Sequence, residues 1–321
     1  MAEKKERVIT PLDSKSAVTV FKSISITRSN PREKITSTDL ENLLAQALWK
    51  SFDQLRSEVA MRLRVEEVDL LLTDARVTGI KVDGHQVPDP EGSMGREIEL
   101  DLCITVVRRD KLSTDNAIAF EEGSVRAHLT AAMSGNGEII YVDSGNNLTT
   151  VFLVAPERTS YVGEFEWGKD DVVNAFTSNF VVGTEMGNAL YLRYAEDNAS
   201  PRIIKKFEDI FRDSFGTFVN GITMAVRDSI ELNMNKTKPK PKHTGKSVLK
   251  VKALPPVYVR GFMLPKSVWN KSFMLGDRKI KFIPAPEVDL IKFIDGGENK
   301  VYKELNQLAK RRIKWLMPNN E

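Results

Sequence analysis

A single apolar stripe with helical spacing runs through residues 201–230. Its members recur every three or four positions, and they are Ile204, Phe207, Phe211, Phe215, Phe218, Ile222 and Ala225. This spacing predicts a long amphipathic helix, because it places all of these side chains on one face. Phenylalanines in such a pattern most often belong to a hydrophobic core, so we interpret the stripe as core.

A second helical pattern lies near the start of the chain. Residues 38–41 (TDLE) match a capping box, and apolar side chains then follow at helical spacing as far as Leu63. Strand-like segments flank this helix, one before it and three after it, at residues 18–27, 68–72, 75–82 and 97–107. A strand, a long helix and several strands together predict a small α+β unit.

Two apolar runs in the middle of the chain, residues 138–142 and 149–154, are separated by residues 143–148 (DSGNNL). Glycine and asparagine tolerate positive φ, so this segment predicts a tight β-hairpin. Further helices are expected at residues 123–132, 169–180, 184–196 and 300–317, and further strands at 159–165, 256–260 and 279–283. The chain is therefore expected to mix helices and sheets throughout.

Composition excludes several classes of protein. With 321 residues, 41% of them hydrophobic and 28% charged, the chain is typical of a soluble globular protein of about two domains. No stretch reaches the roughly 18 uninterrupted apolar residues that a membrane-spanning helix requires. Lysine and arginine number 47 against 44 acidic residues, and a net charge of +3 does not indicate nucleic-acid binding. The single cysteine, Cys103, excludes an internal disulfide, and we expect a cytoplasmic location.

Common catalytic and metal-binding signatures are missing from the sequence. The three histidines, His85, His128 and His243, have no second histidine or cysteine at ligand spacing, which argues against a zinc or iron site. The sequence contains no nucleophile elbow, no P-loop and no Rossmann fingerprint. The usual hydrolase, nucleotide-kinase and dehydrogenase sites are therefore not expected.

The hairpin tip allows two interpretations. A tip with small residues can bring backbone N–H groups close to a phosphate, and an aspartate at the strand end, here Asp143, can hold a hydrated Mg²⁺. Alternatively, Asp143 and the two asparagines simply make a good turn. Local sequence leaves both interpretations open.

The run from Ile139 to Phe152 resembles the second phosphate-binding hairpin of actin-like ATPases, which has the pattern D-x-G-x-x-x-T between two apolar strands. Residues 120–129 resemble the helix that precedes this hairpin in FtsA, and residues 18–107 resemble the inserted β-α-β-β subdomain of FtsA and PilM. Residues 254–261 resemble the strand and glycine turn that contact adenosine. The resemblance implies an α+β / α/β fold: an actin-like (ribonuclease H-like) core with an inserted β-α-β-β subdomain.

The same resemblance implies a domain division and a set of site residues. The expected parts are an FtsA-like inserted subdomain with adjoining strands at residues 1–112, an actin-like lobe with the phosphate hairpin at 113–299, and a basic amphipathic helix at 300–321. In such a site Asp143 positions Mg²⁺. The residues expected to bind ATP are Asp143, Gly145, Asn146, Thr149 and Gly261.

The chain departs from the family pattern around the nucleotide. The family's first phosphate loop is not found before Val18, so the chain reads as N-terminally truncated relative to the family. Asn146 and Asn147 stand where the second loop usually has glycines, and Phe262 follows Gly261, where its side chain is expected to crowd a nucleotide. We therefore expect a degenerate ATPase that is not an enzyme, with ATP and Mg²⁺ bound weakly or not at all.

The C-terminal helix carries a second functional signal. FtsA ends in an amphipathic membrane-targeting helix, and residues 300–317 combine apolar and basic side chains in a composition suited to an anionic membrane. The alternative is a terminal helix that packs on the body while its basic side chains extend into solvent. The residues expected to meet the membrane are Lys310, Arg311, Arg312, Lys314, Trp315 and Leu316. The lysine-rich residues 235–252 are expected to form an exposed loop.

Together these features predict a bacterial FtsA-like or PilM-like adaptor that links a cytoplasmic partner or polymer to the membrane in cell division. Its expected partners are a protein, or a second copy of itself, and the inner-membrane surface, which it meets peripherally. The alternatives are an active Mg-ATP-binding actin-like ATPase and a pilus-assembly component. A nucleic-acid-binding protein is a further alternative, which no motif supports.

Overall fold

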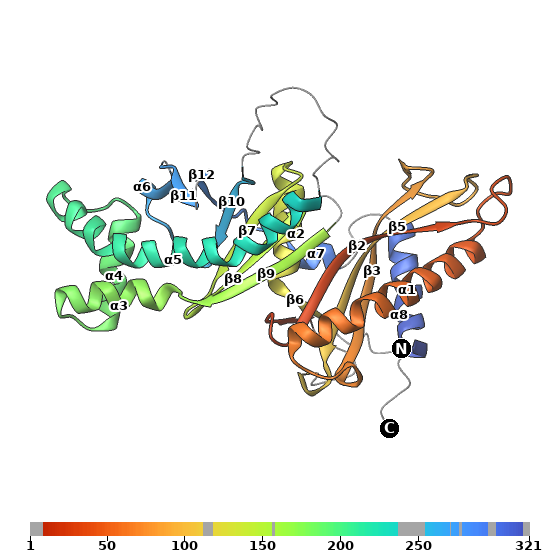
Figure 1. Ribbon diagram of the computed structural model, residues 1–321, viewed down its shortest axis with the longest axis horizontal. Coiled ribbons are helices and arrows are strands. Elements are labelled where there is room, and N and C mark those ends of the chain that lie inside the picture. Colours follow the sequence, from red (N-terminus) through yellow and green to blue (C-terminus); the bar gives the residue numbers. More distant parts are fainter. Residues whose placement is uncertain are drawn as a thin grey trace, which may run out of the picture. The chain divides into compact units, whose positions relative to one another are not determined.

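The computed structural model describes residues 9–111, 118–155, 158–236, 254–269, 271–275, 278–294 and 300–316. The chain forms two compact units, which are treated separately below (Figure 1). Unit 1 comprises residues 1–129, 156–159 and 288–321, and unit 2 comprises residues 130–155 and 160–287. The C-terminal segment is thus grouped with the N-terminal residues. None of the helices within the described ranges is long and apolar enough to cross a membrane.

The sheet of unit 1 has the strand order β2-β5-β3-β4, and its neighbouring strands are antiparallel. Its strands are β2 (Ala17–Thr27), β3 (Leu70–Val82), β4 (His85–Gln86) and β5 (Glu97–Arg108). The segments 68–72 and 75–82, predicted as two strands, form the single strand β3. Its register against β5 shifts twice, between Leu72 and Asp74 and between Val77 and Gly79. These shifts interrupt the apolar alternation, which is why the sequence suggested a break.

Helix α1 (Ser37–Leu63) packs on one face of this sheet and confirms the predicted amphipathic helix. Its capping box is formed by Thr36 and Asp39, so the box predicted at residues 38–41 is wrong by two positions. Thr36 Oγ1 accepts from Asp39 N at 3.2 Å, and Asp39 Oδ2 accepts from Thr36 N at 3.0 Å. Both threonines have an acidic residue three positions later, so the pattern alone could not choose between them.

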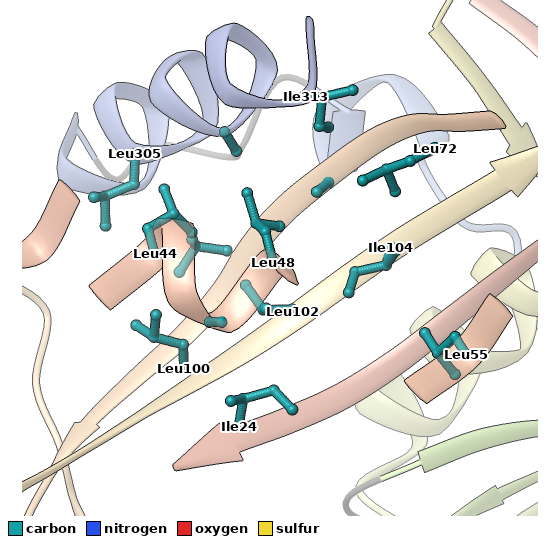
Figure 2. Packing of buried hydrophobic residues seen from close by; sticks show 14 of the residues in the cluster. Ile24, Leu44, Leu48, Leu55, Leu72, Leu100, Leu102, Ile104, Leu305 and Ile313 are labelled. Atoms are coloured by element: carbon teal, nitrogen blue, oxygen red, sulfur yellow. The ribbon is translucent and has the colours of Figure 1, made fainter. Parts of the chain in front are cut away.

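Helix α8 (Lys300–Leu316) contributes to the same core. Figure 2 shows Leu305 and Ile313 of α8 on the same side of the sheet as Leu44 of α1 and Leu72 of β3. At the second register shift of β3, the backbone N–H of Val77 donates to Asn306 Oδ1 at 2.7 Å. The apolar side of the C-terminal helix is therefore part of the interior of unit 1.

A buried polar cluster surrounds Glu121. This residue ends β6 (Ile118–Glu121), which pairs in parallel with β1 (Ile9–Leu12) and leads into α2 (Glu122–Ser134). Glu121 is fully buried. Its carboxylate accepts hydrogen bonds from Thr19 N at 3.0 Å and Ser124 Oγ at 2.6 Å, and it forms a salt bridge with Arg62. These contacts join β2, α1 and α2 through one carboxylate.

His128 of α2 stacks face to face on Phe21 of β2, with ring centroids 3.7 Å apart. Burial lowers the pKa of His128 from 6.5 to about 4. Between these values the unfolded chain binds a proton at His128 and the folded chain does not, so stability falls as the pH is lowered through this window. By about pH 4.5 this loss amounts to roughly 2 to 3 kcal/mol.

We expect the substitution His128→Phe to preserve the stacking and to remove this part of the pH dependence. The measurement is the free energy of unfolding in urea near neutral pH and near pH 4.5 for both chains. The same comparison for His85→Phe, at an exposed position in β4, is the control and should match the wild type. Equal pH dependence in the wild type and His128→Phe would contradict the assignment.

The sheet of unit 2 follows the order β13-β10-β7-β8-β9. Strand β7 (Ile139–Ser144) is antiparallel to β8 (Leu148–Ala155), and β9 (Arg158–Glu166) lies next to β8. On the other side of β7, β10 (Val257–Arg260) and then β13 (Phe282–Pro284) are added in parallel. Three consecutive strands extended by two parallel strands beside the first form an actin-like (ribonuclease H-like) core. With the order β2, α1, β3, β5 in unit 1, this confirms the expected fold class.

Three helices follow β9, and their predictions are confirmed: α3 (Lys169–Phe180), α4 (Thr184–Ala195) and α5 (Pro201–Lys236). The phenylalanines of the apolar stripe in α5 are buried together with residues of β7, β10 and β13. The remaining short elements are η1 (Glu67–Asp69), η2 (Arg109–Lys111), α6 (Lys266–Trp269), β11 (Phe273–Leu275), β12 (Arg278–Ile280) and α7 (Leu290–Ile294). Except for the end of α5, the predicted lysine-rich loop lies outside the described residues.

Candidate functional site

The predicted hairpin is present in unit 2 as β7, a three-residue turn at residues 145–147, and β8. In its register Asp143 is opposite Thr150, and Ser144 is opposite Thr149. The backbone N–H of Gly145 donates to Leu148 O at 2.8 Å and closes the turn. The local prediction of a tight hairpin is therefore confirmed.

The start of α3 is bonded to this turn. Lys169 N donates to Gly145 O at 3.0 Å, and Asp170 N donates to Asn146 O at 2.9 Å. The first N–H groups of a helix have no partner inside the helix, and they commonly bind anions such as phosphate. Here two of them bind carbonyl groups of the turn. The contact requires Gly168, because a Cβ at this position would lie 2.1 Å from Asn146 O.

Thr149, a predicted phosphate-binding residue, is buried. Its hydroxyl donates to Trp167 O at 2.7 Å and lies 3.0 Å from Ser144 Oγ. Trp167 is itself buried and directly precedes the glycine that contacts the turn. Thr149 therefore joins β8 to the segment that leads into α3.

Asp143, the residue predicted to position Mg²⁺, is paired with Arg260. The two residues are neighbours on the parallel strands β7 and β10, and Arg260 Nη1 lies 3.2 Å and 3.3 Å from the two carboxylate oxygens. Among the described residues there is no group of three or more histidines, cysteines, aspartates and glutamates that could hold a metal ion. A Mg²⁺ ion, which proteins usually hold through one or two carboxylates and several waters, would have to compete with this guanidinium for the carboxylate of Asp143.

Gly261 approaches the hairpin more closely than any other residue type could. Its φ is +104°, and a Cβ would lie 1.7 Å from Ser144 O. Phe262, expected to crowd the nucleotide, is instead buried in the core of unit 2. Its ring lies 5.0 Å from that of Trp167 and 5.4 Å from that of Phe218. The expectation for Phe262 is therefore wrong, since its ring packs into the core of unit 2.

The five residues predicted to bind ATP thus gather around one turn of unit 2. Sequence reasoning missed two further residues there, Arg260 and Gly168. Arg260 is the last residue of the strand that precedes Gly261, but its pairing with Asp143 joins positions 117 residues apart. Gly168 stands at the N-cap of α3, and a glycine just before a helical pattern was its only signal.

The residues predicted to meet a membrane belong to α8 in unit 1. Leu305, Ala309 and Ile313, on the apolar side of this helix, are buried, whereas Arg311 and Arg312 are exposed. Lys310 is partly buried. The side chains of Lys314, Trp315 and Leu316 lie outside the described residues. The described part of α8 therefore resembles a terminal helix packed on the body, with some of its cations in solvent.

Unit 1 also has an open groove of about 740 Å³ where α1 ends and η1 begins. Its lining includes Met61 and Val65, the acidic residues Glu66, Glu67 and Asp69, and the basic residue Arg64, and Glu67 forms a salt bridge with Arg56. Met61 is 72% exposed, which is unusual for a large apolar side chain. The groove therefore exposes a large apolar side chain among charged residues of both signs.

No family model matches the chain, and no curated protein matches it. Among solved structures, the chain is similar to a PilM-PilN type IV pilus biogenesis complex at 14% identity, with a TM-score of 0.43 and coverage of 97% of this chain and 81% of that chain. An archaeal actin homolog is 12% identical, with a TM-score of 0.34 and coverage of 97% and 100%. The ethanolamine utilization protein EutJ from Carboxydothermus hydrogenoformans is 11% identical, with a TM-score of 0.33 and coverage of 61% and 56%. These identities and TM-scores are too low to assign the fold by similarity. The fold is therefore assigned from the strand order of unit 2.

Proposed function

We propose that this chain is an adaptor of the actin-like superfamily, of the FtsA or PilM type, with a degenerate nucleotide site. It links a protein partner or a polymer to the inner-membrane surface in cell division, and this role needs no catalytic residue. The observation that carries the proposal is that the groups of the hairpin that would bind Mg-ATP already have partners within unit 2. Asp143 is paired with Arg260, the hydroxyl of Thr149 with Trp167 O, and the N–H of Gly145 with Leu148 O.

The alternative, an active ATPase, has less support from this geometry. Hydrolysis requires phosphates, a metal ion and a water molecule held together. The N–H of Gly145, which would approach a phosphate, donates to Leu148 O, and the first N–H groups of α3 bind the turn. The carboxylate of Asp143 faces a guanidinium. These contacts favour an adaptor over an enzyme.

The partner-binding part of the proposal rests on unit 1. The groove at the end of α1 offers exposed Met61 beside charged residues of both signs, and Val68 next to them in η1 is 70% exposed. Exposed apolar side chains within a charged rim are typical of surfaces that bind another protein. We therefore place the docking of a protein partner in the β-α-β-β subdomain, at this groove.

The experiment that tests the degenerate site is a thermal shift with millimolar Mg-ATP on the wild type and on Asp143→Asn. A ligand at 100 times its dissociation constant stabilises by about 2.7 kcal/mol, which raises the melting temperature by roughly 5 to 10 °C for a unit of this size. We expect no shift in either chain. A shift of this size in the wild type that disappears in Asp143→Asn would establish the ATPase reading instead.

A second arm of the test concerns the membrane. Deleting α8 would remove part of the core of unit 1, so the deletion cannot separate lipid binding from folding. The double substitution Arg311→Glu/Arg312→Glu changes only exposed side chains. We expect it to abolish co-sedimentation with anionic vesicles, while Arg202→Glu/Lys205→Glu, an equal charge change at exposed positions of α5, leaves co-sedimentation intact. Equal binding by all three chains would remove α8 from the proposal.

A further inference from the structure

The ion pair at the hairpin occupies the position at which a metal ion would be expected. Asp143 and Arg260 are register partners at the carboxyl ends of the parallel strands β7 and β10. One guanidinium nitrogen, Arg260 Nη1, lies at nearly equal distances of 3.2 Å and 3.3 Å from the two carboxylate oxygens. The guanidinium thus lies in front of the carboxylate, as a bound cation would.

The charge of this cation does not depend on conditions in the cell. An arginine side chain stays protonated at every physiological pH, and its planar head binds a carboxylate more specifically than a lysine does. The Asp143 side chain is 20% exposed and that of Arg260 is 37% exposed, so the pair is partly shielded from solvent. A divalent ion at Asp143 would have to displace the guanidinium or lie next to a charge of the same sign.

The backbone holds Arg260 in this place. The next residue, Gly261, lies against Ser144 O so closely that no side chain fits between them. Strand β10 has β7 on one side and β13 on the other, and Ala285 N donates to Val259 O at 2.9 Å. The base of the arginine side chain is therefore fixed relative to Asp143 by paired backbone on both sides.

We infer that the guanidinium of Arg260 takes the place of a divalent cation at this hairpin, so that the site is metal-independent. The inference deepens the proposed function. It rests on that function in one respect, because it takes the hairpin to be a degenerate form of a Mg²⁺-dependent nucleotide site. The pair joins β7 to β10 without requiring a bound ion. Arg260 is thus a positioning residue that supplies the counter-charge of Asp143.

The test compares the melting temperature in millimolar Mg²⁺ with that in EDTA for the wild type and five variants. We expect no Mg²⁺ response in the wild type or in Arg260→Lys, which retains a cation. Arg260→Gln removes the guanidinium from Asp143, so this chain should melt lower in EDTA and regain about 2 °C or more in Mg²⁺. The double variant Asp143→Asn/Arg260→Gln should lose that response. Arg212→Gln, which removes an exposed ion pair on α5, controls for the loss of an arginine.

Two results would overturn the inference. One is a Mg²⁺ response of the wild type that Asp143→Asn abolishes, and the other is an Arg260→Gln chain that is insensitive to Mg²⁺. Adding ATP separates this inference from the proposed function. Stabilisation of the wild type by ATP in EDTA, unchanged by Mg²⁺, would refute the degenerate site and support a metal-independent one. Stabilisation that requires both Mg²⁺ and Asp143 would refute both.

Discussion

Replacing Gly261 with alanine is expected to destabilise unit 2 by about 4 kcal/mol or more, since both strain and overpacking act at this position. The new Cβ would lie 1.7 Å from Ser144 O, which is a backbone atom that cannot move away without breaking the hairpin. Alanine would also have to adopt a φ of +104°, which side chains strongly disfavour. The measurement is the urea concentration at which each chain is half unfolded, followed by circular dichroism.

The matched control is Gly216→Ala, in the helix α5 of the same unit. A Cβ at this position has no atom within 4 Å, so the added methyl group meets open space. The variant should be more stable than the wild type by up to about 1 kcal/mol, because alanine favours a helix over glycine. Identical midpoints for the two variants would show that the close approach of Gly261 to Ser144 has been misjudged.

Glu121→Ala is expected to cost about 3 to 5 kcal/mol of the stability of unit 1, the range found when one partner of a buried ion pair is removed. Without the carboxylate, Thr19 N and Ser124 Oγ lose their hydrogen-bond acceptor. Arg62, whose side chain is only 17% exposed, loses its salt bridge. The loss should appear as a lower urea midpoint and a lower melting temperature.

The neighbouring substitution Glu122→Ala serves as the control. Glu122 pairs with Arg126 one helical turn away, and its side chain is 30% exposed. Its loss should cost only about 0.5 kcal/mol, as for other helical ion pairs of this spacing. If the two variants were equally stable, Glu121 would have no special part in joining β2, α1 and α2.

Much of the fold could be predicted because its signals are local. The period of the phenylalanine stripe predicted α5, and the Gly-Asn turn between two apolar runs predicted the hairpin. Local patterns were less reliable for predicting where a helix or strand begins and ends. The capping box could be read at Thr36 or at Thr38, and the register shifts of β3 made one strand look like two. Hydrogen bonds in the folded chain decide where α1 begins and whether β3 is one strand or two.

The contacts at the hairpin could not be predicted, because their partners are distant in sequence. Arg260 reaches Asp143 only after α3, α4 and α5 have been inserted between β9 and β10. The hydrogen bonds between the start of α3 and the turn form only because Gly168 has no side chain. The sequence does not indicate which part of the backbone a glycine will approach. Phe262 was misjudged for the same reason, since its ring packs against Trp167 and Phe218, which are distant in sequence.

The hydrogen bond from Val77 to Asn306 has a consequence for the solution behaviour of the chain. Strand β3 has β5 on one side, but on its other side the short strand β4 pairs with it only at Lys81 and Val82. An edge with open N–H groups is a template on which a second chain can add a strand and aggregate. By supplying an amide oxygen and a buried apolar face there, α8 protects β3 from such pairing. Loss of α8 from the core would therefore also expose the edge of β3 to such pairing.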